Sequence, residues 1–369
     1  MKKIILLLTF FILNTQSFAT TDLSEFTNII SDFDNEIIDS EEYAKIIDNL
    51  KSGNFEFNYK KIFNKIGRIF SSEIKNNVGL IIQITIIAIL SGLLNNIKGD
   101  FASTGIGQIA FYLSYIVIIT LVVSNFSTIV DIAKNSIFTT VSFMNVFTPV
   151  ILSFILSTGG FATSSMIYPV IVFITNIISN LMNSVVIPLL LTSFGIGLVA
   201  NISNKNKLTK LSKTMRSVIM WGVGIVLTVF VGIVSLEGTI ATTVDGITVK
   251  TAKFMFSNGV PVVGKILGDS IDTILGSTIV LKDVVGVVGV IILLALLLTP
   301  IAKILIFMFM YNITAVIIEP FAESRIVKSL EEVSGGIKVV LALMLTINIM
   351  FIVGIVSMLK MTNAITMFR

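Results

Sequence analysis

From residue 78 to the C-terminus, apolar residues form long blocks separated by short polar stretches. About 20 consecutive apolar residues are enough for a helix to cross the hydrocarbon core of a bilayer. One block, the last but one, is too long for a single span; it contains Thr299-Pro300 and predicts a tight helical hairpin. Other blocks are short enough to be re-entrant. The pattern therefore predicts nine membrane spans, or seven to eight if short blocks do not cross. The blocks are Val78–Ile97, Ile109–Val130, Val141–Leu156, Met166–Leu181, Val185–Ile202, Val218–Leu236, Val284–Ile318 and Val339–Leu359.

Composition supports this interpretation. Hydrophobic residues make up 54% of the chain, charged residues only 13%, and the mean hydropathy is +0.96. Soluble domains carry about 25% charged residues, and a soluble fold could not bury an apolar fraction as large as that of this chain. We therefore expect an all-α polytopic membrane protein of about seven to nine transmembrane helices, with an N-terminal amphipathic helical segment and a central amphipathic or re-entrant helical segment.

The first 19 residues are typical of a secretory signal peptide. Lys2 and Lys3 precede a short apolar core, and Ser17-Phe18-Ala19 offers small residues where a signal peptidase cleaves. An uncleaved N-terminal anchor is the alternative. Either interpretation places the following segment outside the cytoplasm.

Residues 20–77 differ from the rest of the chain, because they contain half of its 22 acidic residues. Apolar residues recur there at helical spacing, for example at Phe26, Ile29, Ile30 and Phe33. We expect two or three short amphipathic helices on the non-cytoplasmic side. They form either a small solvated cap or a docking surface for partner proteins.

The loop after the fifth predicted span fixes the orientation of the chain. It holds five cations and no acidic residue, which is typical of a cytoplasmic loop. Counting from the signal peptide independently places this loop inside. Transmembrane helices 1–6 would then occupy residues 78–236, residues 237–283 would lie outside, and the C-terminal helices of residues 284–369 would end inside. The cytoplasmic topology anchors are Lys205, Lys207, Lys210, Lys213 and Arg216.

Residues 237–283 are too polar for a lipid-facing span and too apolar for a free loop. Ionisable residues at bilayer depth usually face a protein interior or a wet cavity. They could therefore line a pore or cavity, although an interfacial lid held by ordinary ion pairs fits the same pattern. Asp269 and Asp272 share a helical face, which favours solvation of that face over acid–base chemistry. The candidate lining residues are Glu237, Asp245, Lys250, Lys253, Asp269 and Asp272.

The sequence offers little for catalysis. It contains no Cys and no His, which removes most metal sites and the usual nucleophile systems. Gly259 to Ile266 nearly matches a phosphate-binding loop, but Ile266 replaces the hydroxyl residue and Pro261 lacks an N–H donor. We predict no catalytic residue, no metal site and no cofactor. The distribution of cations behind the net charge of +4 is explained by membrane topology and does not indicate nucleic-acid binding.

Small residues and prolines predict helix breaks and close helix packing. Broken helices are tolerated in membranes where they are buried or line a cavity. The predicted breaks are at Gly159, Gly160, Pro169, Pro188 and Pro300. The small-xxx-small set Gly224, Thr228 and Gly232 predicts a close helix–helix approach.

From Ser157 to the C-terminus, ordered motifs resemble the stage III sporulation protein AE family of endospore-forming bacteria. Glu237 and Lys250 depart from the pattern, since the family has Gln and Arg there. The signal peptide and amphipathic head also fit the family plan. The motifs are Gly159-Gly160-Phe-Ala-Thr-Ser-Ser to Tyr168-Pro169-Val-Ile, Val186-Ile-Pro188-Leu-Leu, Leu227-Thr-Val-Phe230-Val-Gly232 before Glu237-Gly238, Thr243-Val-Asp245-Gly246, Lys250-Thr-Ala-Lys253-Phe254, Pro261-Val-Val-Gly264, and Lys282-Asp283-Val-Val-Gly286-Val-Val-Gly289.

This resemblance implies a function that composition does not. Members belong to the sporulation complex, proposed to be a channel or feeding tube, that joins the mother cell to the engulfed forespore. The chain would be a multi-pass component of the mother-cell membrane. Its partners would be other subunits of the stage III membrane complex, the forespore-side partner and the lipid bilayer, and a homo-oligomer is left open. A stand-alone secondary transporter is the alternative, and an intramembrane enzyme is the third hypothesis.

Overall fold

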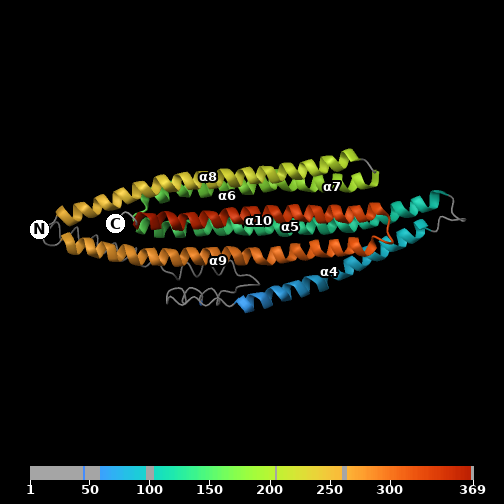
Figure 1. The fold of residues 1–369 in the computed structure, drawn as a ribbon, viewed down its shortest axis with the longest axis horizontal. Helices are drawn as coiled ribbons and strands as arrows, with labels where there is room; N and C mark the ends of the chain where they lie inside the picture. The colour runs from blue at the N-terminus through green and yellow to red at the C-terminus, as the bar shows by residue number, and fades with distance from the viewer. Residues whose placement is uncertain (1–44, 46–58, 97–103, 204–205, 260–263, 367–369) are drawn as a thin grey trace.

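The computed structural model describes residue 45 and residues 59–96, 104–203, 206–259, 264–366. The described residues fold into long helices that run back and forth along one axis, with no strand among them (Figure 1). In chain order they are α4 (Tyr59–Asn96), α5 (Thr104–Ser157), α6 (Phe161–Leu181), the π-helix η1 (Met182–Val186), α7 (Ile187–Ser203), α8 (Asn206–Gly259), α9 (Gly264–Ile318) and α10 (Ser324–Thr366). The predicted signal peptide lies outside the described residues.

The helices are much longer than a bilayer is thick. α5 and α8 have 54 residues each and α9 has 55. At 1.5 Å per residue such a helix extends about 80 Å, whereas the hydrocarbon core is about 30 Å thick. These helices therefore reach well beyond any single bilayer.

Among the described residues, six helical rods are long and apolar enough to cross a membrane, and α6, η1 and α7 count as one of them. The expected count of seven to nine spans is not confirmed. Val141–Leu156 is the last part of α5, and the two blocks on either side of residue 183 form one rod. The six spans are Asn64–Leu93, Tyr112–Ser157, Phe161–Ile202, Lys207–Met255, Leu275–Ile318 and Ser324–Met361.

The predicted hairpin at Thr299-Pro300 is wrong, because α9 continues through Pro300 to Ile318. A proline removes one backbone hydrogen bond, and neighbouring helices can hold the helix together. α9 packs against α4, α5, α8 and α10, which supports it on several sides. α6 likewise runs through Pro169 without a break.

α7 follows directly on η1, and Pro188 is the second residue of α7. A π-helical turn inserts one extra residue into the hydrogen-bond ladder, and such turns are known sites of helix distortion. The backbone thereby adapts to the missing N–H of Pro188 without ending the rod. Of the five predicted breaks, Gly159 and Gly160 lie in the turn between two rods, whereas Pro188 lies at the junction of η1 and α7 within one rod.

An even number of antiparallel rods determines where the chain ends. α5, α8 and α10 all end at one end of the bundle (Figure 1). α4, α7 and α9 end at the opposite end. An additional crossing at Pro300 was expected to place the C-terminus on the side opposite to residues 237–283, whereas α10 ends at the same end of the bundle as α8.

Residues 237–283 do not form a separate element. Their described residues are the last part of α8 and the first part of α9. The predicted boundary at residue 77 also falls within a helix, since α4 begins at Tyr59.

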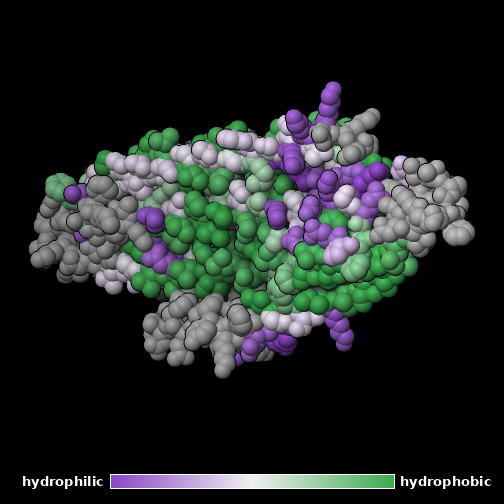
Figure 2. Space-filling view, turned by 45° about the vertical axis from the view of Figure 1, so that its right-hand side comes forward, coloured by the Kyte–Doolittle hydropathy of each residue, from purple (hydrophilic) through white to green (hydrophobic). Residues whose placement is uncertain are grey.

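Three helices carry matching charge-free stretches of about 20 residues: Ser217–Leu236 of α8, Val284–Ala302 of α9 and Val339–Leu359 of α10. Contacts align them: Arg216 of α8 pairs with Glu332 of α10, and the ammonium of Lys282 on α9 donates to the carbonyl of Leu359 on α10. Figure 2 shows a largely hydrophobic surface on which hydrophilic residues gather toward one end. We call these three stretches the charge-free belt.

Candidate functional site

The carboxylate of Asp245 caps the start of α6. Asp245 lies on α8 and is 1% exposed. Its Oδ1 accepts the backbone N–H of Ala162 at 2.7 Å and its Oδ2 accepts that of Thr163 at 2.8 Å. The first N–H groups of a helix have no partner within the helix, and a carboxylate there is further favoured by the helix dipole. Asp245 therefore ties α8 to the N-terminus of α6.

The turn before α6 depends on glycine. Gly159 has φ of 85°, which side-chain-bearing residues rarely adopt. The N–H of Gly160 donates to Ile155 at 3.0 Å and the N–H of Gly159 donates to Leu156 at 2.9 Å. These two bonds form a Schellman cap at the end of α5. A Cβ on Gly159 would also meet Val249 of α8 at 2.8 Å, so α8 packs directly against this turn.

A buried ion pair joins α8 to α10 at the opposite end of the belt. Nη2 of Arg216 lies 2.7 Å from Oε1 of Glu332, and both side chains are nearly buried. Nε of Arg216 donates to Ser193 on α7 at 3.1 Å, and Ser212 donates to Glu332 at 3.0 Å. A buried charge is tolerated when it is paired and its remaining donors are satisfied, and this network meets both conditions.

Two glycines make room for this ion pair. A Cβ on Gly197 of α7 would collide with the carboxylate of Glu332, and a Cβ on Gly335 would lie 3.3 Å from Nη1 of Arg216. The close approach of α7 and α10 at this level thus depends on the absence of a side chain at residue 197.

Three further polar contacts link the rods. The hydroxyl of Tyr115 on α5 donates to the carbonyl of Leu198 at 3.0 Å and lies 2.8 Å from Oγ of Ser329. The hydroxyl of Thr140 donates to Oδ1 of Asn348 at 2.9 Å in the middle of the bundle. Such bonds orient membrane helices, because few other polar partners are available at that depth.

Lys282 is fully buried near the end of the belt on α9. Its ammonium donates to the carbonyl of Leu359 on α10 at 3.1 Å and lies 3.1 Å from Oδ1 of Asp283. A Cβ on Gly286 would collide with Leu359, so the two helices are also close together here. Lys282 thereby fixes the axial position of α10 relative to α9.

The described members of the predicted pore-lining set, Glu237, Asp245, Lys250 and Lys253, have different surroundings. Asp245 is used as a cap, Lys250 is exposed and Lys253 is half-buried. Glu237 is partly buried, and its Oε2 has no hydrogen-bond partner among the described residues. Asp269 and Asp272 lie in the first turns of α9, where the side chains are outside the described part. The part of the chain that is described holds no cluster of carboxylates that could bind a metal ion.

The predicted packing set lies on the outside of the bundle. A Cβ on Gly224 or Gly232 would meet nothing within 4 Å, and Thr228 is exposed. No helix of the described residues packs closely on this face.

The predicted topology anchors divide into two kinds. Lys207, Lys210 and Lys213 are exposed on the first turns of α8, whereas Arg216 is buried in its pair with Glu332. Lys205 lies outside the described residues.

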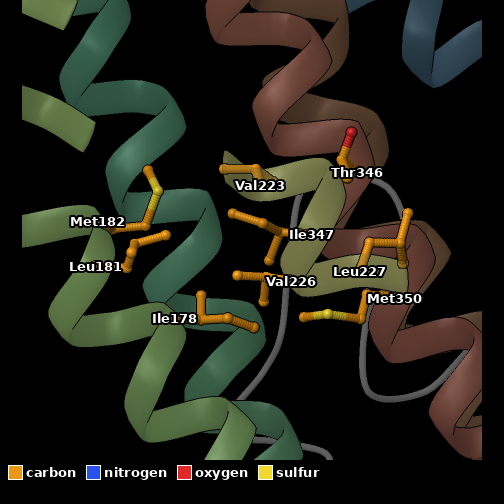
Figure 3. A pocket seen from close by; sticks show the side chains of 9 residues that line it. All are labelled: Ile178, Leu181, Met182, Val223, Val226, Leu227, Thr346, Ile347 and Met350. Carbon is orange, nitrogen blue, oxygen red and sulfur yellow. The ribbon is translucent and has the colours of Figure 1, made fainter. Parts of the chain in front are cut away.

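Two small apolar cavities flank Met182 of the π-helix. One has a volume of about 10 Å³ and is lined by α6, η1, α8 and α10, with Ile178, Met182, Val226 and Met350 pointing into it (Figure 3). The other is of the same size and lies between Met182, Ile137 and Val340. A volume near 10 Å³ holds one water at most, so neither cavity can hold a solute.

Sequence reasoning missed several residues that join the rods: Glu332, Tyr115, Ser193, Asn348 and Lys282. A polar residue within an otherwise apolar stretch was the available signal for Tyr115, Asn348 and Lys282. Glu332 lies in a run of mixed charge, where nothing in the sequence separates it from its exposed neighbour Glu331.

The fold defines a class: all-helical proteins whose long apolar helices are suited to a membrane and are linked by buried polar contacts. Within this class the chain belongs to the stage III sporulation protein AE family, whose sequence model matches residues 42–362. It is 29% identical over 292 residues to the stage III sporulation protein AE of Bacillus subtilis (strain 168), covering 79% of this chain and 72% of that protein. No solved structure matches the chain. The family is named for sporulation rather than for a reaction.

Proposed function

We propose that this protein is the polytopic membrane component of a multiprotein sporulation complex that links mother cell and forespore and is needed for forespore development after engulfment. The observation that carries the proposal is the family match over residues 42–362, which includes nearly all of the described helices. In this proposal the chain resides in the mother-cell membrane and faces the forespore.

The charge-free belt supports a position in the membrane. It is about 20 residues long on three helices, which matches the hydrocarbon thickness. Arg216 and Glu332 lie at one edge, and Lys282 and Asp283 lie at the other. The edge with Lys207, Lys210 and Lys213 would face the mother-cell cytoplasm, as the excess of cations favours. The turn capped by Asp245 would then face the space between the two membranes.

The packed interior favours an assembled channel over a stand-alone transporter. Transporters of known type bind their substrate near the bilayer midplane, at broken helices. Here the rods continue through Pro169 and Pro300, and the two cavities described above are too small for a solute. A conducting path would therefore form between this chain and other subunits or copies.

Two experiments test the proposal. Deleting the gene should block spore formation after engulfment, and expression of the wild-type chain should restore it. Affinity purification from sporulating cells should recover other membrane proteins of the sporulation complex. Normal spores from the deletion strain would refute the proposal, and solute uptake by the purified protein alone in liposomes would favour the transporter.

A further inference from the structure

Three lysines and a tryptophan lie on one face of α8. Successive helical residues are rotated by 100°, so Lys207 and Lys213 lie within about 60° of Lys210 around the helix, on either side of it. Trp221 follows Lys210 by three turns and lies within about 20° of the same direction. We call Lys207, Lys210, Lys213 and Trp221 the α8 basic face.

Each side chain of the α8 basic face is open to the surroundings. The three lysines are exposed, and Trp221 is 73% exposed, although tryptophan is the bulkiest apolar side chain. Among the described residues, no ion pair involves the ammonium groups of Lys207, Lys210 or Lys213.

The charges on the neighbouring part of α10 are predominantly positive. Glu332 is neutralised by Arg216 at 2.7 Å, which leaves the exposed Glu331 as the unneutralised acidic residue of that pair. The exposed Lys328 and Lys338 of α10 add two further cations. The local charge is therefore positive, although the whole chain carries only +4.

Trp221 marks the level of the bilayer surface. It lies in the second turn of the charge-free stretch Ser217–Leu236, and the lysines lie on the opposite side of Arg216. Tryptophan is enriched at the boundary between headgroups and hydrocarbon. Lys213 is about 12 Å from Trp221 along the helix axis, so its ammonium is near the headgroup region.

We propose that the α8 basic face binds the headgroups of anionic phospholipids, which collect around α8 in the bilayer leaflet on that side. Basic residues close to a membrane surface each contribute about 1 kcal/mol of attraction to anionic lipid. The inference rests on the membrane position proposed above, and it adds a lipid preference that apolar helices alone do not require.

The single tryptophan of the chain makes this preference measurable. The purified full-length protein is reconstituted in mixed bilayers in which either the anionic phosphatidylglycerol or the zwitterionic phosphatidylcholine carries brominated acyl chains, which quench tryptophan fluorescence on contact. The anionic lipid should quench Trp221 at least about twofold more efficiently than the zwitterionic lipid at equal mole fraction. High salt should reduce the difference, because screening shortens the range of the attraction.

Two triple variants test whether the lipid preference depends on the α8 basic face or on the total charge of the protein. In K207Q/K210Q/K213Q the two brominated lipids should quench equally. In the matched control K75Q/K250Q/K360Q, which removes three exposed lysines elsewhere, the preference should persist. Both variants should have the helix content and thermal unfolding midpoint of the wild type.

The outcomes distinguish the lipid preference from the membrane position. Equal quenching in the wild type, or an unchanged preference in K207Q/K210Q/K213Q, would overturn the lipid preference and leave the membrane position intact. Absence of quenching by either lipid would overturn both, since Trp221 would then not contact acyl chains.

Discussion

Oδ2 of Asp245 accepts the backbone N–H of Thr163 at 2.8 Å, across 82 residues of sequence. The same carboxylate binds the N–H of Ala162, so a single side chain of α8 satisfies two of the free donors at the start of α6. The α5–α6 turn is thereby held against α8, which also contacts it through Val249.

Replacement of Asp245 by alanine should lower the free energy of unfolding by about 1–3 kcal/mol, since two buried N–H groups would lose their acceptor. Asp245→Asn should have a smaller effect, because its amide oxygen can still accept one N–H. Thermal unfolding in detergent, followed by circular dichroism, measures both. Lys250→Ala changes an exposed residue one turn away and should match the wild type; an equal loss in Lys250→Ala and Asp245→Ala would contradict the cap.

The pair of Arg216 and Glu332 should be strongly coupled. Arg216→Met leaves the Glu332 carboxylate buried without its partner, and Glu332→Leu leaves the Arg216 guanidinium buried without its partner. Each substitution should therefore lower the free energy of unfolding by about 3–5 kcal/mol. The double variant should be clearly less destabilised than the sum of the two. A double-mutant cycle on thermal unfolding gives the coupling energy, and additive effects would show that the two charges do not stabilise one another.

Gly197→Ala should disrupt the junction of α7 and α10, because the added methyl group would occupy the position of the Glu332 carboxylate. We expect poor yield or early aggregation in size-exclusion chromatography. Gly224→Ala is the matched control, since its methyl group would meet nothing within 4 Å. That control should be tolerated or slightly stabilised, as alanine is a better helix former than glycine. Similar behaviour of the two variants would argue against the close approach at Gly197.

Six antiparallel rods predict which positions share a side of the membrane. The chain lacks cysteine, so a single cysteine introduced at 207, 250 or 360 is the one thiol that a labelling reagent can modify. Lys250→Cys and Lys360→Cys should react with an impermeant thiol reagent from the same side, and Lys207→Cys only from the other. Reaction of positions 207 and 360 from one side would mean an even number of crossings between them, whereas the six-rod fold has three, α8, α9 and α10.

The class of fold was predictable because apolar blocks in a membrane protein must satisfy their backbone bonds as helices. The lengths of the rods were not. Prolines within apolar blocks suggested breaks, but Pro169 and Pro300 are carried within continuous helices that neighbouring rods support. Because α9 continues through Pro300, α10 ends at the opposite end of the bundle from the one expected.

The polar network was only partly predictable. Asp245 was identified as a pore-lining candidate and Arg216 as a topology anchor. The structure instead pairs Asp245 with backbone N–H groups at the start of α6 and Arg216 with Glu332 of α10. Pairing across more than 80 residues depends on which rods become neighbours, and periodicity within one helix carries no information about that. The predicted small-residue contact at Gly224 and Gly232 faces outward for the same reason.

The continuity of the rods has a mechanical consequence. A helix of about 80 Å with no flexible joint behaves as a stiff lever, and a change of about 10° in its tilt displaces one end by about 14 Å relative to the other. The polar contacts at Asp245, Arg216 and Lys282 connect the rods at both ends of the charge-free belt, so the rods would swing as a unit. In the complex proposed above, a subunit that displaces one end of this bundle would therefore move the other end through a distance comparable to the width of a helix.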